Sequence, residues 1–139
     1  MDLPFLQELG RSVKRLQHRQ HRALDAALGE IGSSLAQWDA LRAIEKNPDF
    51  SSHALAELTF MTDQSFGALA LRLEERGLIT RLPGKGRALS HRLTPSGLDI
   101  VTAGTDVVNR VLADSFERLN QTERVQLLSL LSHLLAEKA

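Results

Sequence analysis

Four residues between positions 62 and 76 have the types and the spacing of a surface that contacts DNA bases. Gln64, Ser65, Ala68 and Arg72 would lie on one side of a helix, and none of them is acidic. Amide, hydroxyl and guanidinium groups recognise base edges in a major groove, and small side chains let a helix approach them. A solvated surface helix has the same pattern, so this face alone leaves both interpretations open.

The neighbouring residues predict where this helix begins and ends. Thr62 suits an N-cap because its hydroxyl accepts a backbone N–H of the first turn, and Asp63 suits the positive end of the helix dipole. Gly77 suits the left-handed residue that ends a helix. The opposite face is apolar and is expected to be buried; it consists of Phe66, Leu69, Ala70 and Leu73.

A small basic hairpin is predicted to follow at once. Residues 78–82 and 88–93 have the composition of two strands, and residues 83–86, PGKG, have that of a turn. Between positions 76 and 94 the chain has no Asp or Glu, and its cations are Arg76, Arg81, Lys85, Arg87 and Arg92. Such an uncompensated surface attracts phosphate groups, and Lys85 and Arg87, at or beside the tip, could enter a minor groove. A solubilising loop is the alternative, but the position after a capped helix favours the wing of a winged helix-turn-helix.

Two short helices are predicted ahead of the wing. Residues 35–45, LAQWDALRAIE, predict a helix in which Trp38 is a core anchor. The segment HALAELTF predicts a second helix, capped by Ser51 or Ser52, with Ala54, Leu55 and Leu58 as its buried residues. Residues 59–62 would then turn into the helix that starts at Thr62, and two short helices joined in this way make a helix-turn-helix.

Long amphipathic helices are expected at both ends of the chain. Residues 3–31 predict one whose basic stripe faces DNA, the acids of a partner subunit, or water; the stripe consists of Arg11, Arg15, His18 and Arg22. Thr94 and Pro95 predict the start of another helix, and Asn120 with Glu123 the capping box of a last, leucine-rich one. On a single copy these helices would expose apolar surface, so a homodimer is expected, and an intramolecular bundle is the alternative.

The composition limits the class of protein. The 139 residues are 42% hydrophobic and 24% charged with a net charge of zero, which predicts one folded domain and confines DNA binding to local groups of cations. The absence of Cys excludes disulfides and Cys-based zinc sites. Without a membrane-length apolar run or a signal-peptide core, a cytoplasmic protein is expected. No enzyme is expected, because Asp39, Glu45 and Glu57 lack the spacing of paired carboxylates and Ser65 has no evident His partner.

With these features the chain resembles the MarR family of winged-helix transcriptional regulators over essentially its full length. The matching segments are LAQWDALRAI, HALAELTFMTDQSFGALALRLEERGLITR and the end of the wing, HRLTPSG. The resemblance implies one mainly α domain, 1–139, in which a winged helix-turn-helix lobe at 33–94 with a small β-hairpin wing is joined to dimerisation helices at 1–32 and 95–139. It also implies a homodimer that binds a pseudo-palindromic promoter site in double-stranded DNA, usually as a repressor. Many members release DNA when a small aromatic or phenolic effector binds.

The resemblance also assigns roles to single positions. Three residues match groove-facing positions of the family: Gln64, Ser65 and Ala68. Arg87 matches the wing arginine of the minor groove, and Lys85 stands where an acidic residue commonly holds the wing. Leu71 occupies a position that is often polar, where it either touches a thymine methyl or packs on the wing. No cofactor or metal is expected, and the predicted DNA-binding residues are Thr62, Gln64, Ser65, Ala68, Arg72, Arg81, Lys85 and Arg87.

Two other functions fit the sequence less well. A zinc-responsive regulator would use His18 and His21, three residues apart on one helix, with Asp25 four residues further on, but no compact ligand cluster accompanies them. A winged helix can also serve as a protein-interaction module without specific DNA binding. The cations of the predicted wing oppose that interpretation, and salt-dependent affinity for DNA would distinguish the two.

Overall fold

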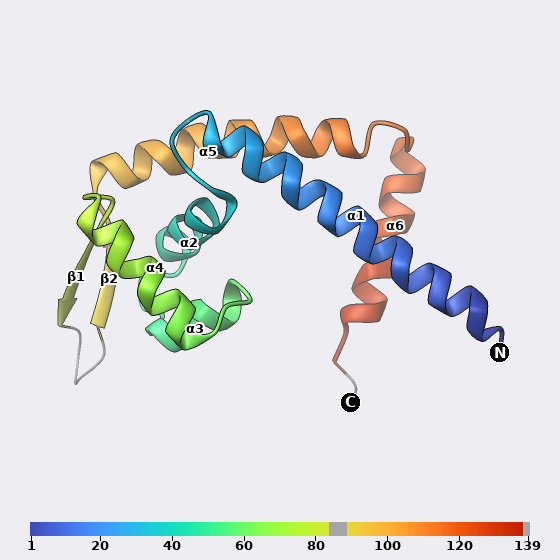
Figure 1. The fold of residues 1–139 in the computed structure, drawn as a ribbon, viewed down its shortest axis with the longest axis horizontal. Coiled ribbons are helices and arrows are strands. Elements are labelled where there is room, and N and C mark those ends of the chain that lie inside the picture. Colours follow the sequence, from blue (N-terminus) through green and yellow to red (C-terminus); the bar gives the residue numbers. More distant parts are fainter. Residues whose placement is uncertain (84–88, 138–139) are drawn as a thin grey trace.

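The computed structural model describes residues 1–83 and 89–137, which form six helices and one antiparallel pair of strands (Figure 1). The elements, in chain order, are α1 (Leu3–Gly29), α2 (Leu35–Lys46), α3 (Ser52–Leu58), α4 (Asp63–Glu75), β1 (Ile79–Pro83), β2 (Leu89–Leu93), α5 (Pro95–Ser115) and α6 (Gln121–Leu135). The predicted fold class, mainly α with a small β-hairpin, is confirmed. No helix in the described part of the chain combines the length and the apolar character needed to cross a membrane.

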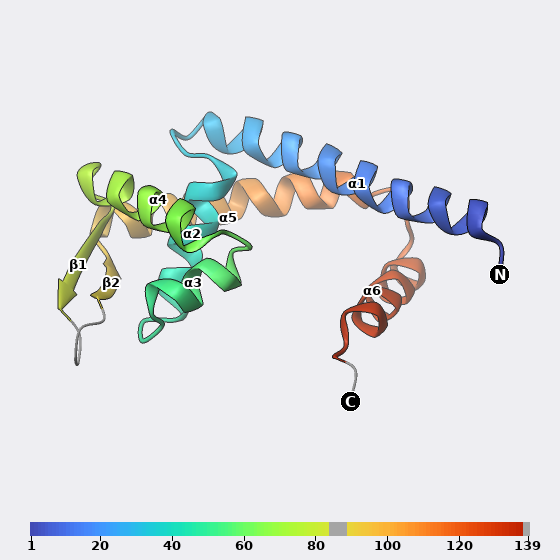
Figure 2. The same ribbon diagram turned by 60° about the horizontal axis from the view of Figure 1, so that its bottom comes forward.

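The short and the long elements occupy different parts of the molecule. The helices α2, α3 and α4 and the hairpin gather at one end, whereas the C-terminal half of α1 packs along α5 and its N-terminal half extends beyond it (Figures 1 and 2). The helix α6 turns away from the far end of α5. Gln20, which interrupts the apolar stripe of α1, donates a hydrogen bond from Nε2 to Ser115 Oγ, 2.8 Å away. This polar contact ties the middle of α1 to the end of α5.

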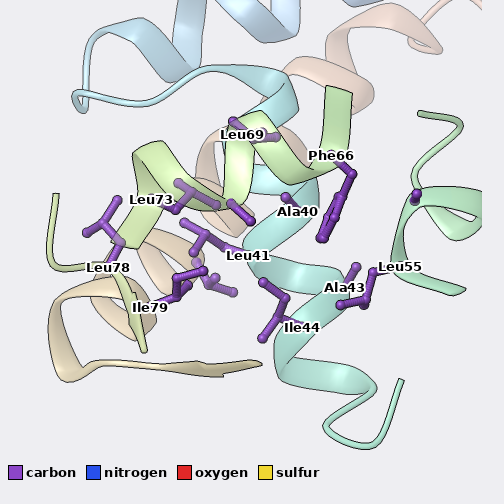
Figure 3. Close-up of a cluster of buried hydrophobic side chains, with 13 residues drawn as sticks. Ala40, Leu41, Ala43, Ile44, Leu55, Phe66, Leu69, Leu73, Leu78 and Ile79 are labelled. Carbon is purple, nitrogen blue, oxygen red and sulfur yellow. The ribbon is translucent and has the colours of Figure 1, made fainter. Parts of the chain in front are cut away.

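One buried cluster holds the short elements together. Leu41 and Ile44 of α2 meet Phe66 and Leu73 of α4 and Ile79 of β1 (Figure 3). These side chains are almost completely removed from solvent, and small residues of the same cluster let α2 and α4 approach closely. The exposed face of α4 is therefore held at a defined orientation by its buried face.

The short helix α3 differs from the prediction in one buried residue. Leu55 is buried as expected and Ala54 is partly buried, but Leu58 is 44% exposed and Ala56 takes its place in the core. The core contacts α3 at Leu55 and Ala56, and Leu58 is the last residue of the helix, where the chain turns toward α4. The helix has only seven residues, so spacing alone could not locate its buried side.

A second buried cluster joins the lobe to the long helices. Trp38 of α2 is 8% exposed and packs with Leu28 of α1 and Val107 and Val108 of α5. Its indole Nε1 donates a hydrogen bond to the Val101 carbonyl oxygen, 3.3 Å away. The expected role of Trp38 as a core anchor is confirmed.

The apolar pattern of α5 is interrupted at Gly104 because the indole lies there. A Cβ atom at this position would overlap Trp38 Cδ1 and lie 2.7 Å from Nε1. The helix continues unbroken from Pro95 to Ser115, so the glycine serves close packing and does not end the helix.

The hairpin pairs in a regular antiparallel register. Ile79 lies opposite Leu93, and Pro83 lies opposite Leu89. Pro83 is thus the last residue of β1. The sequence had predicted that it would be the first residue of the turn. The remaining residues of the predicted turn, 84–86, lie outside the described residues.

Apolar surface remains uncovered at the ends of the chain. The predicted capping box of α6 is present: Glu123 N–H donates to Asn120 Oδ1 and Asn120 N–H donates to Glu123 Oε1, each over 2.9 Å. Yet none of the residues of α6, all of which are described, is buried within one copy of the chain. The exposed large apolar residues are Leu3, Phe5, Leu6, Leu9, Val13 and Leu16 on α1 and Val125, Leu128, Leu130, Leu131, Leu134 and Leu135 on α6. The expected alternative, an intramolecular bundle, does not cover these side chains.

Candidate nucleic-acid interface

The helix α4 begins and ends at the residues predicted from the sequence. Thr62 is its N-cap, and its Oγ1 accepts a hydrogen bond from the Ser65 N–H at 3.0 Å. At the other end Gly77 has a φ of 73°, the left-handed conformation in which glycine carries no steric cost. The Leu78 N–H returns to the Leu73 carbonyl oxygen over 2.9 Å, which closes the last turn.

The two faces of α4 divide as predicted. Its buried side chains are Phe66, Leu69, Ala70 and Leu73, and its solvent-facing ones include Gln64, Ser65, Ala68 and Arg72. Thr62, at the entrance, is also exposed. The structure therefore brings five of the predicted DNA-binding residues together on one open surface, while their contact with DNA stays a prediction.

The outward stripe of α4 contains two residues not included in the predicted set. Gln64, Ala68, Leu71 and Glu75 follow one another at steps of four, three and four residues and share the side opposite the core. Leu71 is 45% exposed and belongs to neither buried cluster. Of the two placements considered from the sequence, packing on the wing is therefore not observed within the described residues.

The turn between α3 and α4 is held by a histidine that the sequence reasoning missed. His53 Nδ1 lies 2.8 Å from Asp63 Oδ1, and His53 Nε2 lies 3.0 Å from Glu57 Oε1. The hydrogen bond to Asp63, followed by the charges of the two carboxylates, raises the pKa of His53 above its ordinary value. The step of four residues from His53 to Glu57 was visible in the sequence, but the contact with Asp63 depends on the turn.

The same turn exposes an aromatic side chain. Phe60 has a φ of 59°, which is uncommon for a residue with a Cβ, and its side chain is 96% exposed. The Met61 N–H next to it donates to the Ala56 carbonyl oxygen over 2.8 Å, so the turn is closed by a backbone hydrogen bond.

The cations of the hairpin region that lie among the described residues have partners within the protein. Arg81 Nη2 lies 3.1 Å from Glu74 Oε1, and the hydrogen bond from Arg81 lowers the pKa of Glu74. The expectation that Arg81 is uncompensated is therefore wrong, because its acid comes from the end of α4, just before the acid-free segment. Lys85 and Arg87 lie outside the described residues, so both remain predictions.

Two other cations of this segment donate to neutral oxygens. Arg76 donates to the Gln37 side chain at 2.6 Å and to the Gly32 carbonyl oxygen at 3.0 Å. Arg92 donates to the Pro48 carbonyl oxygen at 2.6 Å. Because these partners carry no negative charge, they hold both guanidinium groups in place without compensating their positive charge.

A buried histidine connects the hairpin to the helix-turn-helix. His91 of β2 is 2% exposed, meets the Phe66 ring edge-on with centroids 6.0 Å apart, and its Nε2 lies 3.5 Å from Ser52 Oγ. Its Nδ1 has no hydrogen-bond partner among the described residues. Burial, reinforced by the nearby charge of Arg81, lowers the pKa of His91. In the sequence it was part of a basic-looking strand, and only the alternation with Leu93 indicated an inward position.

A groove lies between α2 and α5, at the junction of the lobe and the long helices. Its volume is about 510 Å³, and its lining includes Trp38, Arg42, Thr105 and Asn109. The Arg42 guanidinium carbon lies 5.4 Å from the centroid of the Trp38 ring, and its Nη2 lies 3.0 Å from Asp39 Oδ1. The buried Arg42 Nε has no partner among the described residues. The groove is thus lined by the edge of an aromatic ring and by a partly exposed guanidinium group.

The described residues offer no cluster for a metal ion. No three His, Asp or Glu side chains in residues 1–83 and 89–137 gather closely enough to hold one. Asp25, the third member of the zinc ligand set considered from the sequence, instead accepts a hydrogen bond from the Leu35 N–H at 2.9 Å. That carboxylate supports the first turn of α2.

Comparison with known proteins supports the same family from sequence and from structure. The model of the MarR family matches residues 31–88. The HTH-type transcriptional repressor Rv2887 of Mycobacterium tuberculosis is 27% identical over 113 residues, which cover 80% of this chain and 81% of that protein. The crystal structure of Rv2887 in complex with p-aminosalicylic acid is 26% identical, with a TM-score of 0.76 over 92% of this chain and 98% of that one.

A structure solved with DNA shares the whole fold. A mutant MarR from E. coli complexed with operator DNA superimposes with a TM-score of 0.87 over 98% of this chain and 100% of that one, at 21% identity. This likeness concerns the fold, and it extends over α1 and α6 as well as the lobe. Together with the family match over residues 31–88, it shows that the chain is similar in sequence and in fold to the MarR family of winged helix-turn-helix transcriptional regulators.

Proposed function

We propose that this protein is a homodimeric, cytoplasmic repressor that binds a pseudo-palindromic promoter site in double-stranded DNA. The observation that carries the proposal is the outward face of α4, which from Gln64 to Arg72 is exposed, free of acids and rigidly backed by the core. A helix of this kind can enter a major groove. The operator complex of the E. coli relative supports the assignment by fold.

The roles of the site residues follow from their chemistry. The Gln64 amide can form two hydrogen bonds with an adenine edge, and the Ser65 hydroxyl can donate to or accept from a base. Arg72 and the N-terminus of α4 at Thr62 suit phosphate oxygens, which set the register. Arg81 presents a charge already shared with Glu74, so its contribution to phosphate binding is expected to be smaller than that of a free arginine.

Lys85 and Arg87 complete the proposed site from outside the described residues. Both are cations in the segment that connects Pro83 to Leu89. We expect them to add minor-groove or phosphate contacts beside the helix.

The uncovered surfaces of α1 and α6 support the homodimer. Together they carry twelve exposed large apolar residues, which is unusual for a surface that stays in water. Pairing with a second copy through a two-fold axis would bury them, and it would place two α4 helices about one DNA turn apart. The ends of the chain would then provide dimerisation, while the lobe at 33–94 would provide DNA binding.

We further propose that a small aromatic anion releases the DNA by binding in the groove between α2 and α5. The rim of the Trp38 ring can contact such a molecule, and the partly exposed guanidinium of Arg42, which lines the groove, can donate to its carboxylate. The relative Rv2887 was crystallised with p-aminosalicylic acid and with salicylic acid, which supports this class of effector. The angle between the lobe and the long helices can differ between conformations of the dimer. A ligand with a higher affinity for one of these conformations would shift the population toward that conformation.

The repressor proposal is tested by selecting bound duplexes from a random DNA library with the purified protein, with its molar mass determined in the same buffer. A dimer that enriches an inverted repeat, with half-sites about 10 base pairs apart, is the expected result. A folded protein that enriches no sequence would contradict the proposal. It would favour the alternative, a winged-helix module that binds another protein.

The effector proposal is tested on the selected duplex. Salicylate is titrated against the complex while fluorescence anisotropy reports bound DNA, with the wild type, Arg42→Gln and the control Arg118→Gln, an exposed cation beyond α5. Release by wild type and control at salicylate concentrations that leave the Arg42 variant bound is expected. Equal release from all three proteins would place the effector elsewhere.

A further inference from the structure

A lone leucine stands in the middle of the face that we propose to read DNA. The stripe Gln64, Ala68, Leu71 and Glu75 runs along α4 opposite the buried cluster, and its two central members are apolar. Isolated exposed leucines are common and need no explanation in general. Leu71 differs because it is continuous with the proposed base-reading residues on a helix fixed by the core.

Among residues 1–83 and 89–137, the surroundings of Leu71 do not give it a packing role. The lobe core takes Leu69, Ala70 and Leu73 from the same helix and Leu78 and Ile79 from the segment after it, but not Leu71. Almost half of the side chain is open to solvent. A contact that buries it must therefore come from outside the described chain.

In a major groove the one apolar group at a base edge is the C5-methyl of thymine. Three residues of helix advance by about 4.5 Å, and successive bases of a strand are about 3.4 Å apart, so Ala68 and Leu71 would face neighbouring base pairs. Gln64, one turn earlier, would lie beside an adenine or another base with matching donor and acceptor.

On the basis of the proposed DNA-binding function, we propose that Leu71, together with Ala68, recognises the C5-methyl groups of two neighbouring thymines in each half-site. Each methyl group would move out of water and pack against the alkyl side chains on this face of α4. Loss of one such contact is expected to weaken binding about three- to fivefold, the effect of one buried methyl or methylene group. The half-site should therefore contain adjacent A·T pairs at the centre of the helix footprint.

The test replaces thymine by deoxyuridine, one position at a time, in the selected duplex. This change removes only the methyl group and keeps base pairing. For the wild type, we expect a three- to fivefold loss of affinity at two neighbouring positions of each half-site. In Leu71→Ala and Leu71→Gln, the loss at one of these positions should disappear, whereas affinity for a scrambled duplex stays unchanged.

The control is Leu98→Ala, which shortens a leucine of similar exposure on α5. It should retain the full deoxyuridine profile. If an inverted repeat is selected but no thymine methyl couples to Leu71, the inference is overturned while the regulator proposal stands. If no sequence is selected at all, the regulator proposal fails and the inference falls with it. Circular dichroism and thermal unfolding of each variant exclude misfolding as the cause.

Discussion

The close approach of α5 to the end of α4 makes a specific prediction for Gly97→Ala. A Cβ atom at Gly97 would overlap the Leu78 carbonyl oxygen and lie 3.1 Å from its carbonyl carbon. Both atoms belong to the backbone, so no side-chain rotation relieves the overlap. The first turn of α5 must move away from the segment that follows α4.

The cost can be worked out from the bonds at this junction. The Thr94 N–H donates to the Leu78 carbonyl oxygen over 3.0 Å, and the Thr94 hydroxyl donates to the Gly77 carbonyl oxygen over 2.6 Å. Each bond contributes about 1 kcal/mol, and overpacking adds about 1–3 kcal/mol. The higher helix propensity of alanine offsets about 1 kcal/mol. The free energy of unfolding should therefore fall by about 2–4 kcal/mol.

The assay is urea unfolding followed by the fluorescence of Trp38, the single tryptophan, which is buried between the lobe and the long helices. Protein concentration is held constant because dimerisation would add to the apparent stability. The matched control is Gly67→Ala within α4, where a Cβ atom would meet nothing within 4 Å. The control should be unchanged or about 0.5–1 kcal/mol more stable. A Gly97 variant as stable as the control would refute the close approach.

Three further predictions concern the cap, the buried histidine and the ion pair of the interface. Thr62→Ala removes the acceptor of the Ser65 N–H and should lower the free energy of unfolding by about 1 kcal/mol. Thr62→Ser keeps a hydroxyl and should retain the stability of the wild type. If urea unfolding showed the same loss for both variants, the capping role of the Thr62 hydroxyl would be contradicted. Because the fold lowers the pKa of His91, the unfolded chain binds the proton first, so stability should fall as pH drops below about 6.5 toward the folded pKa. His91→Gln should lack the part of this pH dependence that is due to His91. If the stabilities of wild type and variant changed in parallel between pH 8 and pH 5, the contribution of His91 would be ruled out. Glu74→Gln removes the acid that pairs with Arg81 and should tighten binding to scrambled DNA. The slope of log affinity against log salt concentration, measured by fluorescence anisotropy, should become steeper by up to about one unit. An unchanged slope would mean that Arg81 does not reach a phosphate.

The features of α4 that arise within a few residues could be predicted from the sequence. Thr62 contacts the residue three positions later, and Gly77 adopts its conformation for reasons local to the helix end. The burial of Phe66 and Leu73 follows from spacing alone because the helix is long enough to show its period.

Contacts that cross a turn could not be predicted in the same way. The pair of Glu74 with Arg81 forms because the chain reverses at Gly77, and the contact of His53 with Asp63 forms because α3 and α4 meet at an angle that the sequence does not state. Charges counted along the chain therefore overestimated the free positive charge near the hairpin. Lys85 and Arg87, the remaining cations, keep their predicted roles as predictions.

The pattern at the C-terminus indicated a partner without identifying it. The last helix is rich in leucine, and the sequence predicted that a single copy would leave its apolar surface exposed. The structure of one copy leaves every residue of this helix unburied, which agrees with the proposal that a second copy is the missing partner. Gly104, in contrast, looked like an interruption until the position of the Trp38 ring gave its reason.

The most direct test of the central claim measures how strongly the exposed face of α4 discriminates between DNA sequences. Affinities for the selected duplex and for a scrambled duplex are compared at one salt concentration in wild type and in Gln64→Ala. Loss of the amide should reduce the preference for the selected duplex by about 1–3 kcal/mol and leave the affinity for the scrambled duplex unchanged. An unaltered preference would mean that this face does not read the operator.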